Sequence, residues 1–218
     1  MYGTPRTVSD VMTETVAAVG RRAPFKEIVQ LMQDWGISAL PVIEGEGRVV
    51  GVVSEADLLP KEELRDDPDT GHLPLRKPVD VTKAGALTAE GLMTSPAVTV
   101  MASATLAEAA RIMARQGIKR LPVVDDAGLL AGIVSRADLL KIFLRGDEEI
   151  AEEIRRDITS HLLPQPSSAV RVEVESGVVT IIGRIRDTAL VPTVARLVRA
   201  VEGVADVQFD LMHGAAQR

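Results

Sequence analysis

The chain has 218 residues, a formal net charge of −6 and a hydrophobic content of 46%, which is typical of a folded globular protein and excludes wholesale disorder. It has no cysteine, which excludes disulfides, thiolate metal sites and cysteine nucleophiles, and its 2% of aromatic residues disfavours stacking on single-stranded nucleic acid. The negative charge disfavours binding to a phosphate backbone, and no apolar run approaches the roughly 18 residues of a membrane span. We therefore expect a soluble, cytoplasmic protein with an aliphatic core and no nucleic-acid partner.

The first predicted unit has the order strand, helix, strand, strand, helix. Val16–Val19 is a short apolar strand candidate, and apolar residues recur at helical spacing over residues 25–35. Leu40–Ile43 and Val49–Val53 flank a turn that contains glycine, and they predict a hairpin. A second helix is expected to begin after Ser54.

The same pattern returns further along the chain. A shift of 81 residues aligns Met12–Leu59 with Met93–Leu140 without a gap, and 19 of the 48 pairs are identical, against roughly three expected by chance. Between the copies, residues 61–88 carry prolines and mixed charge and predict an irregular spacer, with a short helix at Thr82–Leu92. One copy is too small to bury a sufficient core. We therefore expect the two copies to pack about a pseudo-twofold axis, with two symmetry-related clefts between them.

A third predicted unit follows the second copy. Isoleucines spaced four residues apart after Ile150 indicate a helix, and valines that alternate with charged residues after Val170 indicate a strand. A turn at Ser176 leads into a returning strand, and a helix with an apolar face at Leu190–Val201 precedes a last strand at Val204–Phe209. The order α-β-β-α-β predicts a small layer of helices on one sheet.

Two motifs of the repeats can carry chemistry, namely G-V-V-S-E-A-D, which ends at Asp57, and G-I-V-S-R-A-D, which ends at Asp138. Each lies where a predicted strand runs into a helix, so the serine hydroxyl and the backbone N–H groups there can bind an anion. The aspartate can accept two hydrogen bonds from a ribose diol. The same spacing is also that of a capping box, which satisfies the helix's own donors and needs no ligand. Both interpretations stay open.

Both copies resemble CBS (cystathionine-β-synthase) domains, on the G-I-x-x-L-P-V segments at Gly36–Val42 and Gly117–Val123 and on the two G-h-h-S-x-x-D segments, where h is an apolar residue. The resemblance implies an α+β fold with α/β-type layers, in which two β-α-β-β-α repeats form one module. It also implies a non-enzymatic regulator that requires no cofactor and binds AMP, ADP, ATP or S-adenosylmethionine in the clefts between the repeats. A homodimer through the exposed apolar helix faces is implied as well.

The resemblance assigns ligand contacts to both clefts. In that family the aspartate of one repeat holds the ribose, and the hydroxyl beside it contacts the ribose or a phosphate. The first strand and the G-I-x-x segment of the other repeat enclose the adenine. One cleft would then contain Thr13, Ala17, Ile37, Ser38, Ser135 and Asp138. Its pseudo-symmetric mate would contain Thr94, Val98, Ile118, Lys119, Ser54 and Asp57.

One difference between the copies concerns the phosphate. Arg120, which we place beside the Asp138 cleft, corresponds to Ala39 in the first copy. A guanidinium makes bidentate, charge-assisted contact with a phosphate and an alanine makes none. We therefore expect a nucleotide phosphate to prefer the Asp138 cleft. The alternative for Arg120 is a solvated charge at a strand end, paired with Asp125 or Asp126.

The third unit, residues 147–212, resembles a BON domain, on the E-I-x-x-x-I helix, the pattern V-x-V-x-x-G-x-V-x-I-x-G at Val172–Gly183 and G-V-x-x-V at Gly203–Val207. The resemblance implies binding to a phospholipid surface or to another macromolecule, and the two kinds of domain occur together in bacteria. From Asp147 to Arg218 there are 12 Asp and Glu against 8 Arg, a net charge of −4, which opposes an anionic membrane unless the arginines cluster. The partner, protein or lipid, is left open.

The expected organisation is a first repeat at residues 8–60, a spacer at 61–88, a second repeat at 89–146 and a BON-like domain at 147–212. The leading hypothesis is a sensor that binds an adenosine-containing ligand and passes the change to its BON-like domain or to a partner. The alternative is a ligand-free scaffold whose BON-like domain binds protein or a membrane surface. We expect neither a catalytic centre nor a metal site, because the sequence offers no nucleophile–base pair and no histidines at ligand spacing.

Overall fold

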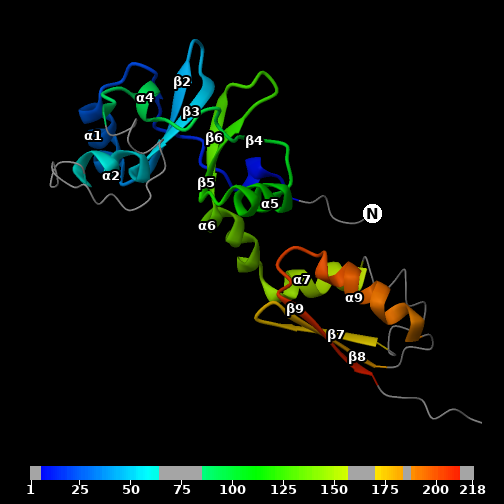
Figure 1. Ribbon diagram of the computed structural model, residues 1–218. Coiled ribbons are helices and arrows are strands. Elements are labelled where there is room, and N and C mark those ends of the chain that lie inside the picture. Colours follow the sequence, from blue (N-terminus) through cyan, green and yellow to red (C-terminus); the bar gives the residue numbers. More distant parts are fainter. Residues whose placement is uncertain (1–5, 64–84, 157–169, 184–187, 212–218) are drawn as a thin grey trace, which may run out of the picture. The chain divides into compact units, whose positions relative to one another are not determined.

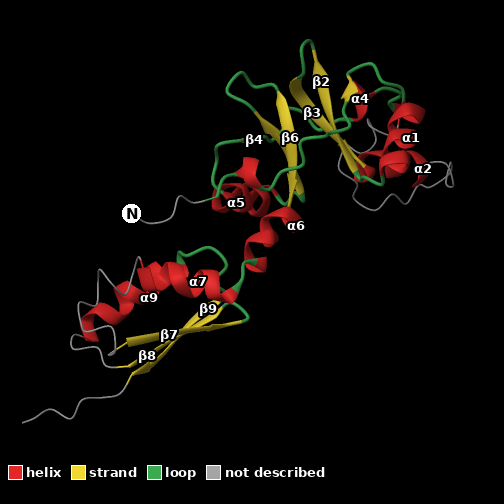
Figure 2. Cartoon of the chain, turned by 180° about the vertical axis from the view of Figure 1, so that it is seen from behind, coloured by secondary structure: helices red, strands yellow, loops and turns green. Residues whose placement is uncertain are grey.

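The computed structural model describes residues 6–63, 85–156, 170–183 and 188–211. They belong to an N-terminal unit, Thr7–Arg136, and a C-terminal unit, Ala137–Arg218 together with Met1–Arg6. Helices and strands alternate in both units (Figures 1 and 2), which confirms the α+β class. None of the helices in the described ranges combines the length and the apolar character that crossing a membrane requires.

The first repeat has the predicted order of elements. It consists of β1 (Val19–Gly20), α1 (Phe25–Trp35), β2 (Ala39–Glu44), β3 (Arg48–Ser54) and α2 (Glu55–Glu63). β2 is the middle strand of the sheet, parallel to β1 and antiparallel to β3. α1 ends at Gly36, whose φ of 60° is the left-handed conformation that a helix C-cap commonly needs. The strand predicted at Val16–Val19 is shorter than expected, since only its last residue and Gly20 pair with β2.

The second repeat repeats this plan. It consists of α4 (Ala89–Leu92), β4 (Val100–Met101), α5 (Leu106–Gln116), β5 (Arg120–Val124), β6 (Leu130–Ser135) and α6 (Arg136–Leu139). α4 is the end of the helix predicted at Thr82–Leu92, and most of the predicted spacer lies outside the described residues. α5 begins with a capping box in which hydrogen bonds from the backbone N–H and the hydroxyl of Thr105 lower the pKa of Glu108.

The segments that lead into the two repeats are exchanged between them. Thr13 precedes the first repeat's β1 but forms two backbone hydrogen bonds of 2.9 Å with Ile133 in β6 of the second repeat. Thr94 precedes β4 and pairs in the same way with Val52 in β3, at 2.9 and 3.1 Å. The outer strand of each β-hairpin is therefore paired with the leading segment of the other repeat. The two hairpins lie side by side (Figure 1).

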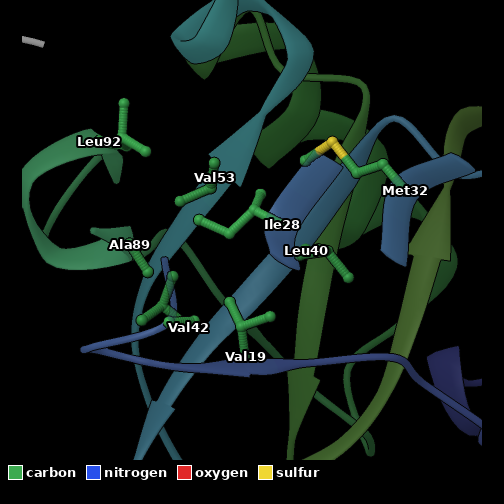
Figure 3. Packing of buried hydrophobic residues seen from close by; sticks show 9 residues of the cluster. Val19, Ile28, Met32, Leu40, Val42, Val53, Ala89 and Leu92 are labelled. Carbon is green, nitrogen blue, oxygen red and sulfur yellow. The ribbon is translucent and has the colours of Figure 1, made fainter. Parts of the chain in front are cut away.

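The hydrophobic core of the first repeat contains the same exchange. Ile28 of α1, Leu40 of β2 and Val53 of β3 are fully buried, and so are Ala89 and Leu92 of α4, which belongs to the second repeat. Figure 3 shows the α4 side chains next to the strands of the first repeat. The first repeat therefore does not complete its core alone, as the size of one copy predicted.

The glycine in each G-x-V-S motif is explained by the exchanged segments. A Cβ atom at Gly51 would lie 2.4 Å from the sulfur of Met93, and one at Gly132 would lie 2.6 Å from the sulfur of Met12. Each methionine therefore covers the strand of the other repeat at a point where only a glycine leaves room. The paired Met12 and Met93 thus serve packing between the repeats.

The C-terminal unit has the predicted α-β-β-α-β order, with short additions. Its elements are the 3₁₀ helix η2 (Leu140–Leu144), α7 (Asp147–Ile154), β7 (Val170–Glu175), β8 (Val178–Gly183), η4 (Thr188–Leu190), α9 (Val191–Arg199) and β9 (Asp206–Leu211). β8 is the middle strand, antiparallel to β7 and parallel to β9. α7 and α9 bury apolar residues on this sheet, and Ile154 and Val198 form a core with Ile181 of β8. The helix predicted from Ile150 onward continues to Ile154, and residues 157–169 lie outside the described ranges.

Polar contacts fix the ends of this unit's elements. The carboxylate of Asp147 accepts hydrogen bonds of 2.9 Å from the backbone N–H groups of Ser176 and Gly177, so α7 begins against the β7–β8 turn. The φ angles of 51° and 75° at these two residues belong to the primed turn that joins tightly paired strands. The Arg145 side chain, 9% exposed, binds Glu149 and Glu153 at 2.7 and 2.8 Å.

Candidate ligand-binding site

A cavity of about 360 Å³ lies in the N-terminal unit and is lined by residues of both repeats. Its volume falls in the range of sites for small molecules. All six residues predicted for the second cleft line it, namely Ser54, Asp57, Thr94, Val98, Ile118 and Lys119. The structure therefore brings together the residues that the resemblance assigned to that cleft, and their role in binding stays a prediction. We call this cavity the Asp57 pocket.

Asp57 is positioned by the junction of β3 and α2. Its Oδ2 atom accepts hydrogen bonds from the backbone N–H of Ser54 at 2.8 Å and from the Ser54 hydroxyl at 2.7 Å. This is the helix-capping geometry that the Ser-x-x-Asp spacing allowed. Asp57 also lines the pocket. The cap therefore fixes Asp57 at the wall of the pocket and does not remove it from the site.

The two G-I-x-x segments are held against the starts of the helices by matching hydrogen bonds. The N–H of Glu55 in α2 donates to the carbonyl of Ser38 at 3.1 Å, and the N–H of Arg136 in α6 donates to the carbonyl of Lys119 at 3.1 Å. Arg136 also donates from Nε to the carbonyl of Ile118 at 3.1 Å. These contacts hold the first residue of α2 and of α6 against the G-I-x-x segment of the same repeat.

The charges that line the Asp57 pocket come from opposite repeats. Glu55 and Asp57 of the first repeat supply two carboxylates, and Lys119 and Arg120 of the second supply two cations. Apolar residues complete the wall, among them Val98. A ligand with polar hydroxyls at one end and an anion at the other would meet complementary groups on both sides.

Arg120 lines the Asp57 pocket, and its Nη1 donates a hydrogen bond to the hydroxyl of Ser38, which we expected in the Asp138 cleft. The expected role of Arg120 in the Asp138 cleft stays a prediction. The alternative pairing with Asp125 or Asp126 is not the arrangement found for this guanidinium. Position in the strand did not reveal that the long side chain crosses the seam to the first repeat.

Several of the other residues predicted for the Asp138 cleft are linked through β5 and β6. Thr13 pairs with β6, and Ser38 lines the Asp57 pocket. Ala17 and Ile37 pack at the edge of the first repeat's core. Ser135 ends β6 and is the strand partner of Arg120. Asp138 forms an ion pair of 2.7 Å with Lys141 in the C-terminal unit, and the cleft around it stays a prediction.

Sequence reasoning missed some residues of the site. Glu55, Pro96 and Ala97 line the Asp57 pocket although no motif singled them out. The alignment of the repeats could have revealed Glu55, because its counterpart 81 residues later is Arg136, a reversal of charge within the motif. Within the described ranges there is no group of three or more His, Asp or Glu suited to hold a metal ion, and all three histidines lie outside those ranges.

Comparison with known families gives the class of protein. Residues 8–61 and 89–145 match the CBS domain, and residues 146–211 match the BON domain. The chain therefore belongs to the CBS-domain proteins, and a BON domain follows its CBS pair.

Particular relatives match the CBS pair. The uncharacterized protein MJ1426 of Methanocaldococcus jannaschii is 31% identical over 153 residues, which is 63% of this chain and 90% of that protein. The chloroplastic CBS domain-containing protein CBSX2 of Arabidopsis thaliana is 31% identical over 154 residues, 64% of each chain. The crystal structure of CBSX2 in complex with AMP has a TM-score of 0.55 and 30% identity, over 63% of this chain and 96% of that one. Other curated relatives are covered less completely, for example 43% of MJ0188.

Proposed function

We propose that the N-terminal unit is a non-catalytic regulatory module that binds an adenosine-containing ligand in the Asp57 pocket. The observation that carries this proposal is that one cavity joins Asp57 of the first repeat to Lys119 and Arg120 of the second. Asp57 supplies an acceptor for ribose hydroxyls, and the two cations supply donors for a 5′-phosphate. The apolar side chains of Val98 and Ile118 fit the adenine. The AMP complex of CBSX2, 30% identical to this chain, supports this class of ligand.

The pocket also suggests how binding would be passed on. A ligand that touches both repeats binds best to the arrangement in which they lie correctly against one another, so it shifts the population toward that arrangement. The hydrogen bond from Arg120 to Ser38 joins the repeats at this point, and a phosphate would compete for the same guanidinium. We propose that the BON domain or a protein partner responds to the change.

A ligand-free scaffold is the second candidate, and one observation favours it. The Oδ2 atom of Asp57 already accepts two hydrogen bonds from Ser54, so the Ser-x-x-Asp motif has a purely structural use. In this case the CBS pair would serve as a scaffold without a ligand, and the BON domain would bind protein or a membrane surface. The two candidates differ in whether any adenosine compound stabilises the protein.

Thermal unfolding of the full chain with AMP, ADP, ATP and S-adenosylmethionine tests the proposal. A ligand at 100 times its Kd should stabilise the protein by about 2.7 kcal/mol. Asp57→Asn should weaken every adenosine compound, because a neutral amide is a poorer acceptor for two ribose hydroxyls. Arg120→Ala should weaken AMP at least about tenfold and leave adenosine nearly unchanged, because only the phosphate would bind the Arg120 guanidinium.

The matched controls are Arg111→Ala and Asp138→Ala. Arg111 is an exposed arginine of α5 that does not line the pocket, so its loss should leave AMP binding unchanged. Binding that survives Asp138→Ala supports the Asp57 pocket, whereas binding lost only in that variant would assign the ligand to the Asp138 cleft. No shift with any of the four ligands would leave the scaffold as the function.

We also propose that two CBS pairs form a homodimer through their helices. Val29 and Trp35 of α1 are 38% and 51% exposed, and Leu59 of α2 is 57% exposed, so contact between two copies would remove these apolar side chains from water. Analytical ultracentrifugation of the full chain should show a dimer that Trp35→Glu weakens. The same substitution at Gln116, the counterpart of Trp35 81 residues later, is the control for added charge, and a wild-type monomer would contradict the proposal.

A further inference from the structure

A second cavity of about 470 Å³ lies in the N-terminal unit, lined by residues that none of the motifs included. Two arginines line it, Arg21 after β1 and Arg48 at the start of β3, together with the hydroxyl-bearing Ser95 and Thr99. None of its lining residues is acidic. A cavity with two guanidiniums and no carboxylate in its wall is suited to an anion. We call it the Arg48 cavity.

The Arg48 cavity and the Asp57 pocket share a wall. In the segment that leads into β4, Thr94 and Val98 line the Asp57 pocket, whereas Ser95 and Thr99 line the Arg48 cavity. Residues 96–97 line both. An extended chain directs successive side chains to opposite sides, so one short segment can face two cavities. The hydroxyl of Ser95 donates to the carbonyl of Val50 at 3.0 Å and fixes the segment on β3.

The two arginines differ in their contacts. Arg21 donates to Glu44 at 2.6 Å and also to Glu90, and these hydrogen bonds, with that to Glu44 first, raise the pKa of Arg21. The two carboxylates hold the guanidinium in place without using all five of its donors. Arg48 is exposed, and within the described ranges its guanidinium has no ion pair or hydrogen bond. A Cβ atom at Gly128 would lie 3.8 Å from Arg48 Nη1, so the side chain reaches the second repeat's turn.

The internal duplication shows that the fold does not need these arginines. The residues 81 positions after Arg21 and Arg48 are Ala102 and Leu129. Leu129 occupies the same place beside the second hairpin's turn, and it forms a bridge with Arg48 across the seam. The second copy thus has a small residue at the first position and an apolar residue at the second. Arg21 is held by Glu44 and Glu90, whereas Arg48 has no such partner among the described residues, so packing and pairing do not explain its charge.

We propose that the Arg48 cavity binds the phosphate group of a small molecule, with Arg48 as the principal cation and Arg21 as the second. The cavity is larger than a phosphate ion, and its wall includes Val49, Val50 and Val124, which fit an apolar part of the ligand. Because Thr94–Thr99 faces both cavities, occupation of one affects the wall of the other. Binding to the Arg48 cavity does not depend on the proposed function of the Asp57 pocket.

Isothermal titration of the full chain with pyrophosphate tests the proposal. The wild type should bind the probe, and Arg48→Ala should weaken binding at least about tenfold through loss of charge-assisted hydrogen bonds. Arg22→Ala is the matched control, since it removes the same charge beside Arg21 from a residue that lines neither cavity. Unfolding followed by fluorescence of Trp35, the single tryptophan, checks that each variant is folded.

Three results would overturn the proposal. They are absence of pyrophosphate binding by the wild type, an equal loss in Arg48→Ala and Arg22→Ala, and a loss in Arg120→Ala without one in Arg48→Ala. The last result would place the probe in the Asp57 pocket. AMP binding is measured separately, so failure at the Arg48 cavity and failure at the Asp57 pocket are distinguishable.

Discussion

Replacing Leu92 with alanine should destabilise the first repeat, although Leu92 belongs to the second. The side chain is fully buried in the core formed by α1, β2 and β3. Removing a buried leucine side chain costs about 2–5 kcal/mol through lost transfer free energy and the cavity that remains. Chemical denaturation followed by the fluorescence of Trp35, at the end of α1, should show this loss directly.

Hydrogen exchange shows where the destabilisation occurs. In Leu92→Ala the amides of α1 and β2 should lose protection, because their core has been opened. Val11 is the counterpart of Leu92 81 residues earlier, and it is 8% exposed. Val11→Ala is therefore the matched control, and it should leave α1 largely protected. Unchanged protection of α1 and β2 in Leu92→Ala would contradict the exchange of segments between the repeats.

Replacing Arg145 with methionine should destabilise the C-terminal unit by about 3 kcal/mol. The side chain is only 9% exposed and binds Glu149 and Glu153, and it also donates to the carbonyl of Glu202 at 2.8 Å. Glu153 is 19% exposed, so losing its partner leaves a carboxylate that water reaches poorly. Methionine retains most of the apolar stem, so the measured loss reports mainly on the charge and the hydrogen bonds.

The comparison variant is Arg171→Met, in the same unit. Arg171 and its partner Glu173 are 77% and 48% exposed, so this pair should contribute less than about 1 kcal/mol. Hydrogen exchange in β7, β8 and β9 measures the effect, and Trp35 fluorescence, which reports on the other unit, should not change. Equal effects of the two substitutions would show that the buried network of Arg145 does not stabilise the unit.

The internal repeat predicted most of the fold, because periodicity and turn chemistry are local. The 81-residue shift predicted the matching hairpins and helices. Local patterns alone could not predict the exchange of Thr13 and Thr94, since either repeat could have paired with its own leading segment, although the family resemblance had grouped each threonine with the motif of the opposite repeat. That choice is made by tertiary packing.

The sequence predicted which residues line the candidate site better than it predicted where their side chains point. The family resemblance assigned six residues to the second cleft, and all six line the Asp57 pocket. Arg120 was assigned by its place in the strand, and only the direction of its side chain brings it to Ser38. The Arg48 cavity could not be predicted either, because Arg21 and Arg48 are far apart in the sequence and belong to no common motif.

The crossed pairing of Thr13 with Ile133 and of Thr94 with Val52 constrains how the two halves can change. A half on its own would present an open strand edge and an incomplete interior, which is a recognised route to aggregation. A substitution at either crossing must therefore remain compatible with the opposite half. The duplicated halves can diverge in their cavities, as Arg48 and Leu129 already do, but they cannot separate into independent proteins.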